Sequence, residues 1–144
     1  MSSLSLAVSD RIAEACLSEG VARGFAPLTV VVLDAGGHVK TAKRSDGSGI
    51  LRFEIALGKA WGALGMGLPS RALAERAASA PVFFGALAAA SSGRMIPVPG
   101  GVLVRQDGEI VGAVGVSGDT SDNDETCAVA AIAATGLEPD CRVR

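Results

Sequence analysis

The sequence predicts one α/β domain in which helices cover a mainly antiparallel sheet, an α+β or α/β/α sandwich. The chain has 144 residues, a length typical of a single domain. Hydrophobic residues make up 49% of it, enough to build a buried core. Two pairs of apolar segments are each interrupted by a glycine-containing turn, which is typical of antiparallel hairpins, and helical segments elsewhere supply the covering layers. We therefore expect residues 1–144 to form one domain.

A helix and a hairpin are predicted at the start of the chain. Apolar residues recur every three or four positions from Leu4 to Ala15, which predicts a helix that ends near Gly20. The apolar segments 28–33 and 39–42 then lie on either side of an Asp-Ala-Gly-Gly turn, which predicts a β-hairpin.

A long helix is predicted over residues 49–66, with Ser48 as its N-cap. Its inward face is expected to carry Ile50, Phe53, Leu57, Trp61 and Leu64. Gly58, Gly62 and Gly65 form an adjacent ridge, and each glycine in a helix costs about 1 kcal/mol relative to alanine. We expect close packing of another backbone against this ridge, with a flat ligand as the alternative.

Two prolines each begin a further short helix, over residues 70–79 and 81–90. A loop over residues 91–94 follows. Residues 97–101 contain two prolines and two glycines, which forces a turn, and a short strand near 95–98 is an alternative.

The clearest hairpin pairs residues 102–105 with 110–117 around an Asp-Gly turn. One face of its second strand is expected to carry Ile110, Val114 and Val116, and the other Val111, Ala113 and Gly115. Both faces are apolar or small, which indicates a strand covered on both sides. A last helix is predicted from Ser121 to Gly136, with residues 136–144 as a loose tail.

Composition excludes several classes of partner. The 13 basic and 15 acidic residues give a net charge of −2, without the basic excess of a nucleic-acid binder. Aromatic residues are 3% of the chain and tyrosine is absent, so base stacking is also disfavoured. Apolar stretches are too short or too interrupted to span a membrane, and residues 1–6 lack the basic region of a signal peptide.

Cysteine usage and small residues indicate the setting and the assembly. Cys16, Cys127 and Cys141 are an odd number at no metal-like spacing, which favours a reducing, cytoplasmic location. The 25 alanines and 19 glycines allow broad, close contact surfaces, so we expect a homo-oligomer.

Five short motifs occur in order along the chain. They are Asp34-Ala35-Gly36-Gly37-His38, Arg44-Ser45-Asp46-Gly47, Gly58-Lys59-Ala60, Pro97-Val98-Pro99-Gly100-Gly101 and Gly112-Ala113-Val114-Gly115-Val116-Ser117-Gly118. Asp122, Asp124 and Glu125 follow them. From about Leu4 to Gly136 the chain resembles the GlcG/HbpS-like haem-degrading domain family. It departs from many relatives after Gly101, where they continue with a proline and this chain has Val102.

The resemblance implies a profilin-like α/β/α sandwich and a small-ligand binding protein of the haem type. Family members bind or degrade haem, act as partners of corrinoid enzymes, and assemble into dimers or octamers. Non-covalent haem needs an apolar slot and an axial side chain, and His38 is the sole histidine. We expect His38 to be a haem ligand and Pro99, Gly100 and Gly101 to rim the pocket, the alternative being that His38 is a plain exposed hairpin residue.

An enzyme acting on a small organic acid, as an isomerase, lyase or hydrolase, is the alternative function. Backbone N–H groups at Pro99-Gly100-Gly101 would suit an anion. The candidate substrate-binding cations are Arg44, Lys59 and Arg94, and the candidate proton-transfer groups are Asp34, Asp124 and Glu125. For Lys59 the alternative is a solvated helix face, and for the last two acids it is helix capping. A third hypothesis is a structural partner of another enzyme, without any ligand.

Motifs for other chemistry are absent from the sequence. Gly115-Val116-Ser117-Gly118-Asp119 lacks the second glycine of a nucleophile elbow. No His/Cys cluster has metal-ligand spacing, so we expect no metal site, and no phosphate-binding loop of the Gly-Lys-Ser/Thr type is present.

Overall fold

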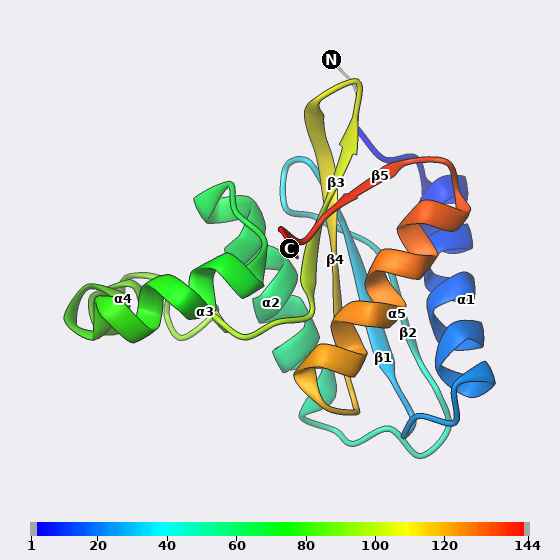
Figure 1. Ribbon diagram of the computed structural model, residues 1–144, viewed down its shortest axis with the longest axis horizontal. Coiled ribbons are helices and arrows are strands. Elements are labelled where there is room, and N and C mark those ends of the chain that lie inside the picture. The colour runs from blue at the N-terminus through cyan, green and yellow to red at the C-terminus, as the bar shows by residue number, and fades with distance from the viewer. Residues whose placement is uncertain (1–2, 143–144) are drawn as a thin grey trace.

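A computed structural model describes residues 3–142 and shows an α/β/α sandwich (Figure 1). In chain order the elements are α1 (Leu6–Ala22), β1 (Thr29–Asp34), β2 (Val39–Arg44), α2 (Arg52–Met66), α3 (Ser70–Ser79), α4 (Pro81–Ala90), β3 (Gly101–Gln106), β4 (Glu109–Ser117), α5 (Ser121–Ala134) and β5 (Glu138–Asp140). The sheet has the strand order β2-β1-β4-β3-β5, and every pairing is antiparallel. The predicted fold class is confirmed.

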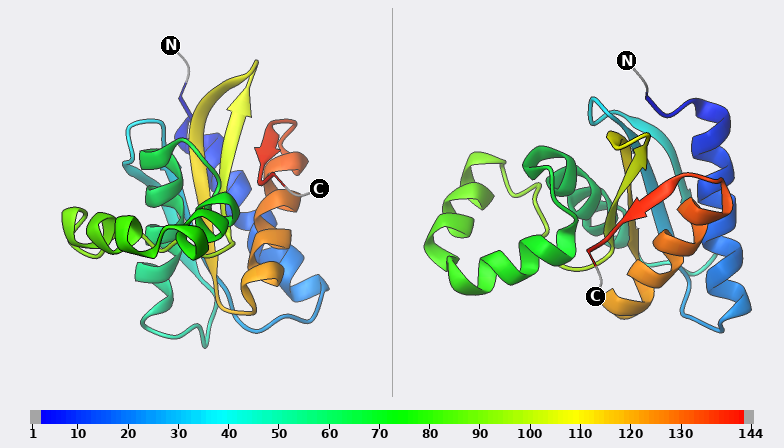
Figure 2. Two further views of the ribbon diagram at one scale, coloured as in Figure 1. Left: turned by 60° about the vertical axis from the view of Figure 1, so that its left-hand side comes forward. Right: turned by 45° about the horizontal axis from the view of Figure 1, so that its top comes forward.

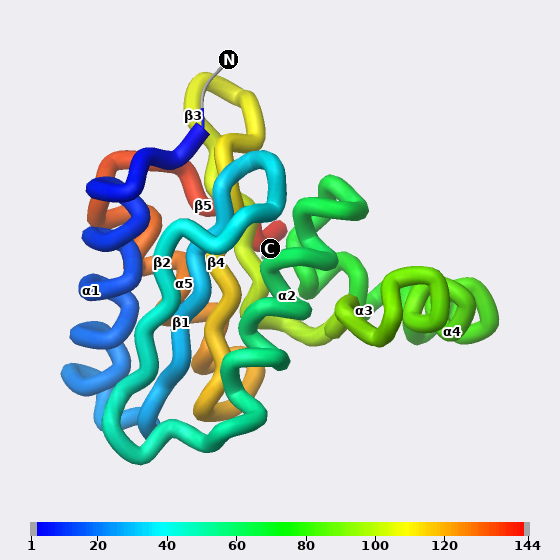
Figure 3. The backbone as a smooth tube through the Cα atoms, turned by 180° about the vertical axis from the view of Figure 1, so that it is seen from behind, coloured from blue at the N-terminus to red at the C-terminus, as the bar shows by residue number. Residues whose placement is uncertain are grey.

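Each face of the sheet carries its own hydrophobic core, because β1 and β4 contain runs of consecutive apolar or small residues. Val30 and Val32 of β1 face the layer formed by α1 and α5. Val31 and Leu33 face α2, which covers the opposite side (Figures 1 and 3). Successive strand residues point to opposite faces, so an uninterrupted apolar strand is buried on both sides.

Strand β4 contains a bulge that alters the predicted faces. Val104 pairs with Gly112, but the next residue of β3, Arg105, pairs with Ile110. The extra residue, Val111, therefore turns to the α1/α5 core, and Ile110 packs on the α2 side. The prediction placed each of these two side chains on the other face of the strand. It is wrong because strict alternation does not anticipate a bulge.

Helix α2 begins at Arg52, three residues later than predicted. Ser48 does not cap it, because the Ser48 hydroxyl instead hydrogen-bonds that of Thr29 at 2.7 Å between the oxygens. Ile50 lies before the helix and is 90% exposed, so its predicted inward position is also wrong. The α2 residues fully buried against the sheet are alanines, and the larger predicted side chains are partly buried around them.

The glycine ridge of α2 packs against a backbone segment, as predicted. A Cβ atom at Gly58 would lie 2.4 Å from Ile96 Cγ1 and 2.6 Å from the Arg94 carbonyl oxygen. The Ile96 N–H also donates a hydrogen bond to the Gly58 carbonyl at 3.2 Å. Residues 95–98 are held in this way without forming the alternative strand. A Cβ atom placed on Gly65, by contrast, would have open space around it, with nothing within 4 Å.

Helices α3 and α4 form an arm that projects from the sandwich (Figures 1 and 2). Their bounds agree with the prediction. Leu73 and Phe84 are buried within the arm, in a small cluster that also includes Leu68. Among residues 3–142, no helix is both long and apolar enough to cross a membrane.

The C-terminal segment is ordered, contrary to the prediction of a loose tail from residue 136. Strand β5 pairs with the outer edge of β3, with Asp140 opposite Leu103. Arg105 Nε also donates a hydrogen bond to Asp140 Oδ2 at 2.9 Å. These contacts cover an edge strand that would otherwise expose its backbone groups. Residues 143–144 lie outside the described part of the chain.

Candidate functional site

A groove of about 410 Å³ lies between the β1–β2 turn, α2 and the loop after α4. We call it the Trp61 groove; its lining residues are Gly37, Val39, Glu54, Leu57, Gly58, Trp61, Ser92, Gly93 and Arg94. The α2 residues among them are spaced at three, four and seven positions, so they share one helix face. Gly37 adopts φ +83°, and a Cβ there would lie 3.8 Å from the Trp61 indole. The groove is therefore shaped by a turn that lies close to an aromatic ring.

Arg94 lies over the ring of Trp61. Its guanidinium carbon is 4.1 Å from the ring centroid, within cation–π distance. Arg94 Nε donates a hydrogen bond to the Ser91 carbonyl at 2.9 Å. Within residues 3–142 its two terminal nitrogens make no other hydrogen bond or ion pair. A fixed cation thus borders an apolar surface.

His38 stands beside this groove, since its neighbours Gly37 and Val39 both line it. The His38 side chain is 79% exposed, and its Nδ1 lies 3.1 Å from Asp34 Oδ1. The backbone N–H groups of Gly36 and His38 donate to the same oxygen at 3.0 Å each. A carboxylate on Nδ1 favours the tautomer with its proton there, which leaves Nε2 as the nitrogen that can bind a metal.

The Asp34 carboxylate is held in its charged form. Partial burial acts to raise its pKa, but the hydrogen bonds from the His38 and Gly36 N–H groups and from the His38 ring outweigh it, and the pKa lies below its ordinary value. Asp34 therefore accepts hydrogen bonds and orients His38, and its role in proton transfer stays a prediction.

Pro99–Gly101 is not brought to the Trp61 groove. The Gly101 N–H donates to Ser70 Oγ at 2.7 Å, and the Gly100 carbonyl accepts from the Val116 N–H at 3.0 Å. A Cβ at Gly101 would lie 2.3 Å from the Lys59 carbonyl oxygen. The two glycines permit close packing of β3 on α2, and Ser70 takes the N–H group that was expected to meet an anion. A role for this segment in ligand binding stays a prediction.

Lys59 and Asp124 form a buried ion pair. Each side chain is 2% exposed, and Lys59 Nζ lies 3.2 Å from Asp124 Oδ2. Lys59 Nζ also donates to the Val116 carbonyl at 2.9 Å, and Asp124 Oδ1 accepts from the Asp119 N–H at 2.9 Å. Since α2 and α5 cover opposite faces of the sheet, the pair joins the two layers. The alternative of a solvated Lys59 is wrong.

Burial opposes both charges of this pair. Desolvation lowers the pKa of Lys59 and raises that of Asp124, while their mutual attraction acts the other way in both cases. Arg52 adds a second positive charge nearby and donates from Nη1 to Ser117 Oγ at 3.2 Å. Arg52 and Lys59 are seven positions apart in α2, so they lie on one helix face.

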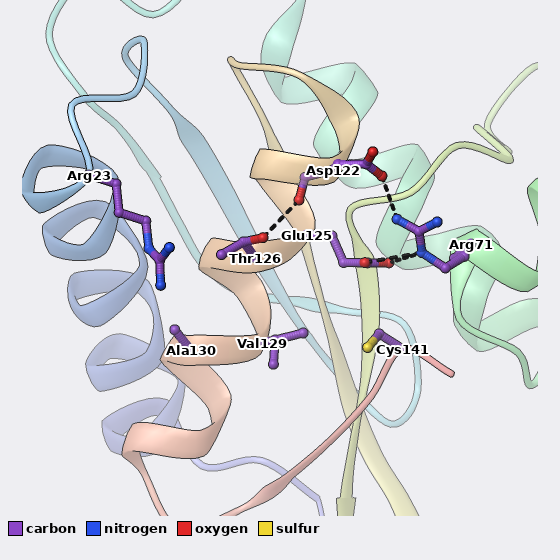
Figure 4. A pocket seen from close by; sticks show the side chains of 8 residues that line it. All are labelled: Arg23, Arg71, Asp122, Glu125, Thr126, Val129, Ala130 and Cys141. Carbon is purple, nitrogen blue, oxygen red and sulfur yellow. Dashed lines mark hydrogen bonds and ion pairs between the residues drawn. The ribbon is translucent and has the colours of Figure 1, made fainter. Parts of the chain in front are cut away.

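Glu125 and Asp122 bind Arg71 of α3 (Figure 4). Arg71 Nε lies 3.0 Å from Glu125 Oε2, and hydrogen bonds to these two acids raise the pKa of its guanidinium. The three residues line a pocket of about 510 Å³ together with Arg23, Thr126, Val129, Ala130 and Cys141. Sequence reasoning missed Arg71, because nothing in the local pattern links α3 to α5.

The predicted catalytic set is only partly assembled. Lys59, Asp124 and Glu125 lie near one another, with Glu125 contributing charge at Lys59. Arg44 instead donates from Nη2 to the Ser48 carbonyl at 2.6 Å, at the end of the edge strand β2. Arg94 lies in the Trp61 groove. Residues 3–142 hold no group of three or more His, Cys, Asp and Glu placed to bind a metal.

The family described as haem-degrading protein HbpS-like matches residues 4–133. The chain belongs to this family. The resemblance drawn from the five motifs is thereby confirmed, and the HbpS-like match extends over nearly the whole described chain.

Similar proteins include both curated sequences and solved structures. Over 111 residues this HbpS-like chain is 29% identical to the corrinoid adenosyltransferase PduO of Salmonella typhimurium, covering 77% of this chain and 33% of PduO. It thus spans one third of the length of PduO. It is 26% identical to an uncharacterised 15.0 kDa protein of Citrobacter freundii, covering 92% of each.

Solved structures share the fold over almost their whole length. The PduOC:haem complex superposes with a TM-score of 0.87 at 25% identity, covering 96% of this chain and 99% of that one. HbpS superposes with a TM-score of 0.81 at 29% identity, covering 93% and 91%. The protein ORFY of Klebsiella pneumoniae gives a TM-score of 0.87 at 25% identity, covering 94% and 92%.

Proposed function

We propose that this HbpS-like chain binds haem in the Trp61 groove, with His38 as the axial ligand. The observation that carries the proposal is an exposed imidazole, held through Nδ1 by Asp34, beside an apolar groove with a cation over its tryptophan. The solved structure of a haem complex of PduOC, with the same fold, supports it.

The residues present fit the chemical demands of haem. A porphyrin needs an apolar wall, which Val39, Leu57 and Trp61 provide. Its iron accepts an axial imidazole nitrogen, and that imidazole is oriented when an acceptor holds its other ring nitrogen, as Asp34 holds His38. When bound, the iron supplies redox and small-ligand chemistry that the side chains lack. The protein's own task is to bind and orient the ring.

A haemin titration followed in the Soret region tests this proposal. We expect saturation near one haem per chain in the wild type, and loss of the saturable Soret shift in His38→Ala. Gln106→Ala, at an exposed position of the other hairpin, is the matched control and should behave as the wild type. An unsaturable spectrum that is the same in all three proteins would contradict haem binding at His38.

The alternative of an enzyme acting on a small organic acid depends on Lys59. Its ammonium group already donates to Val116 and Asp124 and is almost fully enclosed. A substrate anion would have to displace Asp124, so the observed contacts favour a structural role. The enzyme hypothesis and the cytoplasmic location both stay predictions.

Self-association through α4 is a further part of the proposed function. This helix contains no charged residue from Pro81 to Ala90, and Val82 and Phe83 are 87% and 54% exposed. An exposed apolar patch marks an interaction surface, and most soluble oligomers pair identical surfaces of the same chain. We therefore propose a homo-oligomer, from dimer to octamer, in which the arms lie at the interface.

A further inference from the structure

We propose that Arg94 determines the specificity of the Trp61 groove for carboxylated planar rings, by binding a propionate side chain of the porphyrin whether or not iron is present. This inference rests on the proposed haem function and assigns a second recognition element that acts independently of His38. It concerns the loop after α4, which none of the sequence motifs includes.

The geometry of Arg94 suits a carboxylate. Its position over Trp61 and the Nε hydrogen bond to Ser91 fix the planar guanidinium. The terminal nitrogens, which have no partner within residues 3–142, present two parallel donors of the kind that bind a carboxylate in bidentate fashion. An apolar surface beside a fixed cation matches the two parts of a porphyrin, a flat ring and its acidic side chains.

The loop that carries Arg94 is already ordered. Ser92 and Gly93 adopt φ values of +56° and +75°, which turn the chain sharply between α4 and Arg94. The next residues are tied to α2, where the Ile96 N–H donates to the Gly58 carbonyl. Because the cation is positioned before any ligand arrives, binding requires little ordering of this segment.

The charged residues of the Trp61 groove predict the orientation of the bound ligand. Glu54 and Arg94 are the charged residues among the described lining residues. The Glu54 carboxylate repels an acidic side chain, whereas Arg94 attracts it. The acidic edge of the ring is therefore expected at Arg94.

Ligand binding can be measured through the fluorescence of Trp61, because the chain has one tryptophan and no tyrosine. Iron-free protoporphyrin IX removes any contribution from iron ligation, and its dimethyl ester removes the carboxylates. Quenching of Trp61 fluorescence is titrated with each compound, in the same dilute detergent, for the wild type, Arg94→Gln, Arg94→Lys and the control Gln106→Ala.

We expect Arg94→Gln to weaken binding of the free acid about tenfold, as for the loss of a charge-assisted hydrogen bond. Binding of the ester should be weak in the wild type and unchanged by the substitution, and Arg94→Lys should recover part of the affinity for the acid. Equal weakening of acid and ester in Arg94→Gln would overturn the proposal, because it would show that Arg94 only supports Trp61. Equal affinity of acid and ester in the wild type would also overturn it.

The haemin titration separates failure of this inference from failure of the proposed function. A His38-dependent Soret shift together with an unaltered acid affinity in Arg94→Gln would overturn the role of Arg94 and leave haem binding intact. Absence of both porphyrin quenching and the Soret shift would overturn both proposals.

Discussion

At the scale of single residues, the Asp34–His38 pair shows how a short turn orients an imidazole side chain. Three donors from the turn converge on the Asp34 carboxylate and lower its pKa. The unfolded carboxyl titrates near 3.8, so its contribution to folding is complete above that pH and is lost as the pH falls through the lower folded pKa. Asp34 therefore remains charged, and able to orient His38, throughout the neutral range.

The buried Lys59–Asp124 pair leads to a prediction about stability. Lys59→Met should lower the free energy of unfolding by about 3–5 kcal/mol, because Asp124 is left charged and enclosed without its partner. Asp124→Asn should cost a similar amount. The double variant should cost clearly less than the sum of the two, since neither charge remains. Urea unfolding of all four proteins measures this difference, and additive losses would show that the two residues do not interact.

The pH dependence of Asp124→Asn provides a check on the same pair. Burial lowers the folded pKa of Lys59 below its unfolded value of 10.5. In Asp124→Asn no carboxylate opposes this effect, so the folded pKa of Lys59 stays below its unfolded pKa. At pH values between the two, the unfolded chain binds more protons than the folded chain. The free energy of unfolding should therefore rise as the pH is raised towards 10. A stability that is flat over this range would contradict an enclosed, unpaired Lys59.

At the scale of elements, α2 is placed by its glycines. Gly58→Ala should destabilise the protein by about 1–3 kcal/mol, because the new methyl group would meet Ile96 and the Arg94 carbonyl. Gly65→Ala, in the same helix with open space around it, should stabilise the protein by about 0.5–1 kcal/mol through helix propensity. Thermal or urea unfolding of both variants checks the opposite signs. Two variants of equal stability would show that residues 94–96 do not pack on this ridge.

At the scale of the whole molecule, the arm is the feature that a single copy leaves unpartnered (Figure 2). Val82→Glu combined with Phe83→Ser should convert an oligomer into a monomer of 14.4 kDa without loss of helix content. Val21→Glu, at a position in α1 that is 78% exposed, is the control and should keep the wild-type mass. Light scattering at micromolar concentration measures the mass. A monomeric wild type, or a double variant with unchanged mass, would contradict assembly through α4.

The sequence alone determined the local parts of this fold. The bounds of α3 and α4, both hairpins and the family resemblance followed from turn residues, prolines and apolar periodicity. These signals are readable because they depend on residues only a few positions apart. The turn that carries His38 followed in the same way, since it is contiguous in the chain, and the role of His38 as a haem ligand stays a prediction.

Only the tertiary structure decided the contacts between distant segments. Lys59 and Asp124 are 65 positions apart in the chain. Arg94 contacts Trp61 although α3 and α4 lie between them in the sequence, and β5 pairs with the edge of β3. Lys59 on a helix is compatible with a solvated face or with burial, and its environment depends on which element packs against it. The energies of burial and pairing arise where water is excluded between layers. A local pattern does not contain that information, and for this reason the Trp61 groove is found only in the assembled fold.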